Sequence, residues 1–223
     1  MNKSIREAFR DSLSILPGYL VLGMGFGVLL KAKGFNTLFA ALMSVFIYAG
    51  SMQFVGIDLL SNGANLITAF LMTIMVNIRH LFYGIGMLER YQKIKKHQIY
   101  DVFALTDETF SIVSANKDKD DDYYFCLSLF NHIYWVSGSI IGSVLGDIIP
   151  FNYQGIDFSM TALFMVILIS QWEKSDNRLS IILSLIITVL SLVIFGSESF
   201  LIVSMILIVL MLYILKIRGN KDA

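Results

Sequence analysis

The sequence predicts an all-α polytopic transmembrane helix bundle of about seven spans, and three observations lead to that prediction. Hydrophobic residues make up 56% of the 223 residues and charged residues only 15%, whereas a soluble domain carries nearer a quarter charged residues. The apolar residues are gathered into runs that approach or exceed the roughly 20 residues needed to cross a bilayer as a helix. Positive charges concentrate in the connections between these runs. We therefore expect a single integral membrane domain over residues 1–223.

Seven apolar segments carry this prediction, and most connections between them are shorter than ten residues, so that neighbours are expected to form antiparallel hairpins. The exception is the polar connection 89–123. The segments are Ser12–Leu30, Thr37–Leu60, Ala64–Leu88, Tyr124–Ile149, Phe158–Trp172, Leu179–Phe195 and Ser199–Ile217.

The first segment is unusual because it contains Pro17 and the alternating glycines Gly23, Gly25 and Gly27. Glycine and proline weaken a helix interior. Two forms are therefore open, a full crossing of the membrane and a broken or re-entrant segment. The two forms place the N-terminus on opposite sides of the membrane.

Orientation follows from the Lys and Arg residues in short loops, which favour the cytoplasm. With seven full crossings and a cytoplasmic C-terminus, 13 cations lie inside and three outside, namely Lys3, Arg6 and Arg10. A re-entrant first segment would bring those three inside as well. In a third arrangement Tyr100–Ala115 dips through the membrane, which leaves the Arg90–Lys96 cluster outside. We expect the C-terminus to be cytoplasmic.

The second segment is predicted to unwind at Gly50 and Ser51, because glycine lacks a Cβ atom and serine can hydrogen-bond its own backbone. Backbone groups freed at membrane depth are tolerated only where they face protein, water or a ligand. Transporters use such half-helix ends to hold a substrate carboxylate or a cation, and Gln53 would add a neutral donor and acceptor. The alternative is close helix packing at Gly50 and an interhelical hydrogen bond from Gln53.

The third segment carries a charge where charge is costly. Arg79 lies about 15 Å from the polar end at Glu89 if the helix is unbroken, and an uncompensated arginine there costs about 3 to 10 kcal/mol. It therefore needs an anionic partner, either a substrate carboxylate or a protein acid. Asn77 and His80 share a helix face nearby, and His80 is a candidate proton relay. The alternative is a structural Arg–carboxylate pair, with His80 only hydrogen-bonded.

The polar connection holds the strongest candidates for that acid, Asp107 and Glu108. In a helix, Phe103, Asp107 and Phe110 share one side, and an acid on an apolar face is either partnered or titrating. The alternative is a surface amphipathic helix with solvated carboxylates.

The fourth segment carries Gly138, Gly142 and Gly146 at four-residue spacing, which predicts close helix packing. Asp157 is an expected N-cap for the fifth segment.

Several function classes are not supported. No nucleophile elbow, metalloprotease, Walker or dinucleotide motif occurs, so we expect no enzyme and no cofactor. One cysteine and three histidines make a metal site improbable. The 17 cations and 17 anions cancel, so there is no net positive charge to attract nucleic acid. Transport, if present, must use gradients or a separate partner.

Four ordered strings resemble a known family, the AzlC-type large subunits of bacterial branched-chain amino acid permeases. The resemblance covers residues 5 to 215 and is most specific in the first half of the chain. The strings are Pro17 with Gly23-Met24-Gly25-Phe26-Gly27, Tyr48-Ala49-Gly50-Ser51-Met52-Gln53-Phe54, Asn77-Ile78-Arg79-His80-Leu81-Phe82-Tyr83 and Leu105-Thr106-Asp107-Glu108-Thr109-Phe110.

The resemblance implies export of branched-chain amino acids across the bacterial inner membrane, together with a separate small hydrophobic subunit of about four spans (AzlD-like). The glycine face of the fourth segment and the short fifth segment are candidate surfaces for that partner. The competing hypotheses are a structural or assembly subunit and a channel, neither with a substrate site of its own. The site residues therefore rest on the sequence alone: Gly50, Ser51, Gln53, Asn77, Arg79, His80, Asp107 and Glu108.

Overall fold

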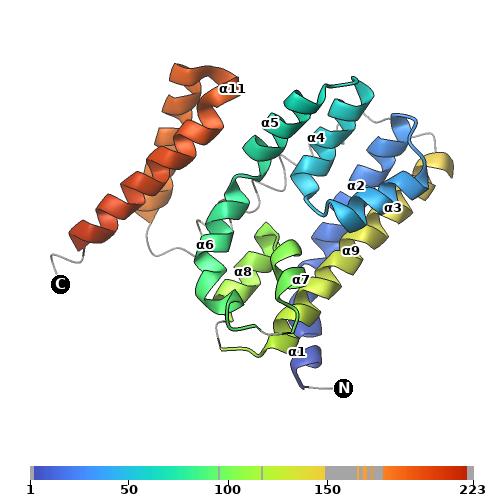
Figure 1. Ribbon diagram of the computed structural model, residues 1–223, viewed down its shortest axis with the longest axis horizontal. Coiled ribbons are helices and arrows are strands. Elements are labelled where there is room, and N and C mark those ends of the chain that lie inside the picture. The colour runs from blue at the N-terminus through green and yellow to red at the C-terminus, as the bar shows by residue number, and fades with distance from the viewer. Residues whose placement is uncertain are drawn as a thin grey trace. The chain divides into compact units, whose positions relative to one another are not determined.

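The computed structural model describes residues 3–94, 96–116, 118–148, 165, 168, 169, 172 and 178–219, and the regular structure within them is α-helical. The chain forms two compact units, Met1–Met160 and Thr161–Ala223. The helices of the first unit (Figure 1) are α1 (Lys3–Ser12), α2 (Leu16–Ala32), α3 (Thr37–Phe46), α4 (Gly50–Ser61), α5 (Leu66–Asn77), α6 (Arg79–Tyr91), α7 (Gln98–Phe103), α8 (Asp107–Ala115) and α9 (Asp121–Ile148).

The centre of the first unit is the pair α2 and α9, which run parallel and side by side (Figure 1). The rings of Tyr19 and Trp135 meet near the beginning of α2, with centroids 5.6 Å apart. At the far end Lys31 forms an ion pair with Asp147 at 2.8 Å. The beginnings of both helices therefore lie at one end of the unit.

Glycines allow these two helices to approach closely. A Cβ atom on Gly23 would lie 2.9 Å from the Trp135 carbonyl oxygen, and one on Gly138 would lie 2.8 Å from the Leu20 oxygen. Gly27 and Gly142 face backbone even more closely. The glycines of the first segment therefore pack and do not break the helix: α2 is continuous, and the bend of 59° lies before it, between α1 and α2.

The second segment is the broken one. Helix α3 ends at Phe46 and α4 begins at Gly50, so the predicted break is present and lies just before Gly50. Tyr48 adopts the left-handed conformation with φ 39°, which is costly for a residue with a side chain. Its ring stacks on His132 of α9 with centroids 4.1 Å apart, and this contact holds the turn.

The break makes α3 and α4 a hairpin whose open ends lie together. The side chain of Asn36 caps α3 by accepting a hydrogen bond from the Phe39 amide at 2.8 Å. At the other open end, Asp58 of α4 lies 3.9 Å from Lys33, directly after α2. The hairpin therefore enters from the Lys31–Asp147 end of the unit and returns to it.

The third segment is also broken, whereas the depth given above for Arg79 assumed an unbroken helix. Helices α5 and α6 meet at Ile78 with a bend of 51°. Arg79 is consequently the first residue of α6 and does not lie within a continuous helix. Contacts from two other helices hold its side chain there.

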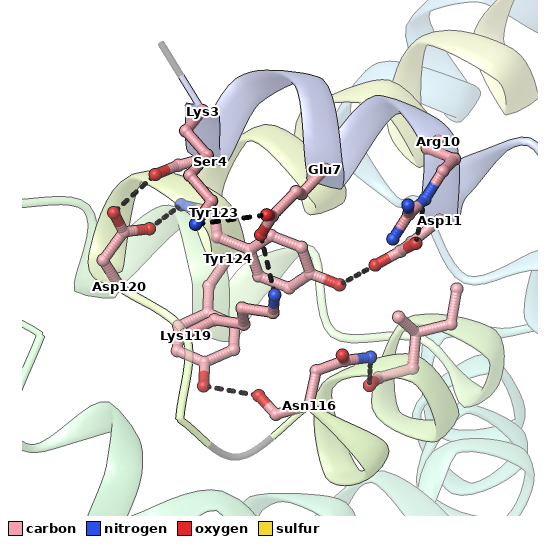
Figure 2. Close-up of polar contacts among 11 residues, drawn as sticks. Lys3, Ser4, Glu7, Arg10, Asp11, Asn116, Lys119, Asp120, Tyr123 and Tyr124 are labelled. Atoms are coloured by element: carbon pink, nitrogen blue, oxygen red, sulfur yellow. Dashed lines mark hydrogen bonds and ion pairs between the residues drawn. The ribbon is translucent and has the colours of Figure 1, made fainter.

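The N-terminal helix is tied to the start of α9 by three polar contacts, shown in Figure 2. Ser4 donates to Asp120 at 2.5 Å, Lys119 pairs with Glu7 at 2.7 Å, and the Tyr123 hydroxyl donates to Asp11 at 2.8 Å. The hydrogen bond to Glu7 raises the pKa of the Lys119 amine.

The second unit contains α11 (Arg178–Gly219), in which Gly196 has non-helical dihedrals of φ 71° and ψ 175°. Judged by length and composition, the residues described include one helix able to cross a membrane, Arg178–Gly196, and up to three such spans if each bent pair (α1 with α2, α5 with α6) counts as one. Seven spans remain a prediction. Most of the expected fifth segment, with Asp157, lies outside the described residues.

Candidate functional site

Arg79 bridges two helices that lie far apart in the sequence. Its Nη1 atom is 2.6 Å from Asp107 Oδ2, at the beginning of α8. Its Nη2 atom donates to Ser51 Oγ, at the beginning of α4. Side-chain exposure is 23% for Arg79 and 18% for Asp107, so the pair is shielded from solvent without being sealed.

The beginnings of three helices meet at this arginine. Helix α4 starts at Gly50, α6 at Arg79 and α8 at Asp107. The first amides of a helix lack partners within it and carry partial positive charge. Thr106 caps α8 by accepting a hydrogen bond from the Thr109 amide, whereas α4 and α6 have no side-chain cap. The uncapped amides and the guanidinium together suit a carboxylate.

The two acids of α8 have different surroundings. Glu108 accepts a hydrogen bond from the Tyr19 hydroxyl of α2 at 2.7 Å, and the same hydroxyl lies 2.6 Å from Thr106 Oγ1. Asp107 uses Oδ2 for Arg79, while its buried Oδ1 has no hydrogen-bond partner among the described residues. Asp107 therefore keeps an acceptor for an ammonium group or a proton.

Gln53 lies in a buried hydrogen-bond chain beside the site. Its Oε1 atom accepts from Trp135 Nε1 at 2.8 Å, and its Nε2 atom donates to Ser44 Oγ at 3.2 Å. This is the interhelical role given above as the alternative. Gly50 also contacts this tryptophan, because a Cβ there would lie 3.0 Å from the indole ring.

His132 extends the chain of contacts toward α7. One ring nitrogen lies 3.2 Å from the Ser44 carbonyl oxygen and the other 2.9 Å from the Tyr100 hydroxyl. Because a carbonyl only accepts, Nε2 donates to Ser44, whereas the Tyr100 hydroxyl can donate to Nδ1 or accept from it. This histidine therefore connects α3 and α7 with both ring nitrogens bonded.

His80 and Asn77 flank Arg79 in the chain, and His80 binds the Asn77 backbone. His80 Nδ1 lies 3.1 Å from the Asn77 carbonyl oxygen, one turn back in its own chain, and its ring meets Tyr83 edge to face at 5.6 Å. The buried Asn77 Oδ1 has no hydrogen-bond partner in the described part of the chain. The relay role of His80 remains a prediction.

Three of the predicted site residues, Ser51, Arg79 and Asp107, lie in contact. Tyr19, which holds Glu108 from a distance of 89 residues along the chain, was not among the predicted site residues. A tyrosine in an apolar segment, two residues after Pro17, was the available signal. The glycines Gly138, Gly142 and Gly146 lie away from this site, facing α2 within the same unit, and α2 occupies the face considered for a partner subunit.

The chain is similar in sequence to proteins of one known family. The family model described as AzlC protein matches residues 14–149. A Bacillus subtilis (strain 168) protein named branched-chain amino acid transport protein AzlC is 41% identical over 96% of this chain and 85% of its own length. An uncharacterized membrane protein of Helicobacter pylori (strain 26695) is 40% identical over 96% of both chains. The inner membrane protein YgaZ of Escherichia coli K12 is 29% identical over 77% of this chain and 74% of its own. No solved structure matches.

Proposed function

Because this chain belongs to the AzlC protein family, we propose that it is the large subunit of a secondary transporter that exports branched-chain and similar apolar amino acids. It would act as a multi-pass protein of the bacterial inner membrane, with a small hydrophobic subunit of about four spans. The family match over residues 14–149 includes every helix that meets at Arg79. The Bacillus relative is named as a branched-chain amino acid transport protein.

The observation that carries the proposal is the position of Arg79 between Ser51 and Asp107 at three helix beginnings. The substrate carboxylate would bind the guanidinium and the uncapped amides of Gly50 and Ser51, and its ammonium would bind the free Oδ1 of Asp107. A zwitterion then satisfies both charges at once, which matters because an unpaired buried charge is costly.

A coupling proton would use the same acids. A substrate carboxylate that takes Arg79 releases Asp107 from its ion pair, so that Asp107 can bind either the substrate ammonium or a proton. Glu108, held by Tyr19, is the second acid that could carry the proton. Substrate ammonium and proton would thus alternate at Asp107.

The test is efflux of labelled leucine, isoleucine, valine and methionine from cells that co-express both subunits. Arg79→Gln is expected to lower efflux at least about tenfold, the effect of losing about 1.4 kcal/mol, at normal membrane abundance. Lys33→Gln is the matched control, because Lys33 forms an ion pair at the unit's far end. Unchanged efflux in Arg79→Gln would refute the substrate role.

The contacts also permit the rival function of a structural subunit, in which the Arg79–Asp107 pair only holds helices together. Removing one partner of a buried pair is destabilising because the other charge is left alone. The rival therefore predicts that Arg79→Gln lowers abundance and that Arg79→Gln combined with Asp107→Asn restores both abundance and efflux. Restored abundance without efflux favours transport.

A further inference from the structure

A cavity lies between α6, α8 and the start of α9, apart from the contacts of Arg79. Its volume is about 450 Å³, within the range of about 300 to 1,000 Å³ typical of small-molecule sites. The residues that matter for its chemistry are Met87, Arg90, Lys93, Phe110, Ser114 and Asp121, all of which line it.

The lining combines both charges with apolar surface. Arg90, Lys93 and Lys119 are cationic, Glu89 and Asp121 are anionic, and Met87 and Phe110 are apolar. Arg90 Nη1 donates to the Val113 carbonyl at 2.6 Å, and Lys119 pairs with Glu7. Such a lining offers partners for a carboxylate, an ammonium and an aliphatic side chain.

An unpaired polar atom lies next to the cavity. The buried Oγ atom of Ser114 has no hydrogen-bond partner among the residues described, although buried polar groups are normally paired. Ser114 lines the cavity, so that rotation of its side chain would bring this hydroxyl to a bound molecule.

Two stacked rings separate this cavity from Arg79. Phe110 lines the cavity and stacks on Tyr83 with centroids 4.8 Å apart and an interplanar angle of 24°. Tyr83 in turn lies close enough to Asp107 to interact with its carboxylate. A Cβ atom on Gly86 would lie 3.4 Å from the Phe110 ring, so this ring packs closely against α6.

We propose that this cavity is a second binding site for zwitterionic amino acids with apolar side chains, from which substrate passes the Tyr83–Phe110 rings to Arg79. The carboxylate binds Lys93 beside Arg90, the ammonium binds Asp121, and the side chain contacts Met87 and Phe110. The substrate class rests on the proposed function, whereas the existence of the site rests on the cavity itself.

The experiment uses Ser114→Cys with Cys126→Ser, which leaves one thiol in the chain, since Cys126 is the only native cysteine. Labelling of the purified full-length protein by a small cationic methanethiosulfonate is measured with and without leucine. We expect leucine to slow labelling at least fivefold and aspartate, which lacks an apolar side chain, to leave it unchanged. Adding Lys93→Gln should abolish protection, whereas adding Arg79→Gln should preserve it.

Equilibrium binding of labelled leucine provides a second measurement that needs no cysteine. The native chain should bind two leucines, and Lys93→Gln and Arg79→Gln should each bind one. Labelling that leucine does not slow, or loss of both bound leucines in Arg79→Gln, would overturn the second site. Protection in a protein whose efflux is independent of Arg79 would support the cavity while refuting the proposed function.

Discussion

At the scale of single residues, Asp101 is a buried acid whose carboxyl group has no hydrogen-bond partner in the described ranges. Its side chain is 0% exposed. It lies in α7, outside the candidate spans. Burial, with a smaller contribution from the Asp121 carboxylate, raises the pKa of Asp101 to about 7. The folded protein therefore holds a proton that the unfolded chain releases at a lower pH.

This shift predicts how stability depends on pH. A folded pKa above the unfolded value gives stability that is present at low pH and lost as pH rises toward about 7. Asp101→Asn, which resembles the protonated form, should reduce the loss of melting temperature between pH 5 and pH 8.5 by at least about 2 °C. Thermal melting of the detergent-solubilised protein measures it. Asp58→Asn, at an exposed carboxylate, is the control, and equal pH profiles for Asp101→Asn and the native chain would contradict the prediction.

Residue-scale reasoning reached the partners of Arg79 because intramembrane acids are scarce and the cost of a lone arginine is large. With few carboxylates available, Asp107 and Glu108 remained as candidates, and the structure pairs Asp107 with Arg79. No comparable constraint led to the contact between Tyr19 and Glu108, since a tyrosine hydroxyl has many possible partners. The partner of a group whose burial costs much free energy is therefore predictable from sequence, whereas the partner of a group with a small burial cost is seen only in the fold.

At the scale of elements, the parallel pair α2 and α9 forms the rigid part of the first unit. Gly142 approaches the Met24 backbone, and Gly138 approaches the backbone at Leu20. Backbone cannot move aside as a flexible side chain can, so any Cβ at these positions forces the helices apart. The pair supports the site, because α2 carries Tyr19 and α9 carries Trp135.

Gly142→Ala should therefore destabilise the protein by about 1 to 3 kcal/mol, the usual cost of overpacking, and lower the melting temperature by at least about 2 °C. Gly84→Ala is the matched control, because nothing lies within 4 Å of its added methyl group. Alanine is a better helix former than glycine, so the control should melt at or above the native temperature. Equal melting of Gly142→Ala and the native chain would show that the helices separate without cost.

Glycine patterns in sequence do not reveal which role each glycine has. Gly23, Gly25 and Gly27 suggested a broken first segment, yet α2 is continuous and two of these glycines pack on α9. Gly50 marked a true break, although it also contacts Trp135. The difference depends on what faces each glycine, which a single sequence does not contain. The bend before Arg79 has no glycine or proline at all.

At the scale of the whole molecule, the contacts of the first unit relate its loops to the two sides of a membrane. Helix α1 lies beside residues 119–123, as Figure 2 shows, so we expect both on one side of the membrane. The open ends of the α3–α4 hairpin lie with Lys31 and Asp147 at the other end of the unit. We therefore expect the hairpin to be the re-entrant element and α2 to cross the membrane.

This arrangement predicts a cytoplasmic N-terminus and satisfies the positive-inside rule. Excluding Arg79, nine of the eleven cations before residue 149 lie in residues 1–11 and 89–123, and only Lys31 and Lys33 lie at the opposite end. Single cysteines at Lys3 and Asp118, with Cys126→Ser, should react with a membrane-impermeant maleimide only in inverted vesicles. Cysteines at Lys33 and Ser61 should react only from the periplasmic side of spheroplasts. Reaction at Lys33 and Ser61 from opposite sides would contradict the re-entrant hairpin, whereas reversal of all four would invert the orientation and leave the hairpin intact.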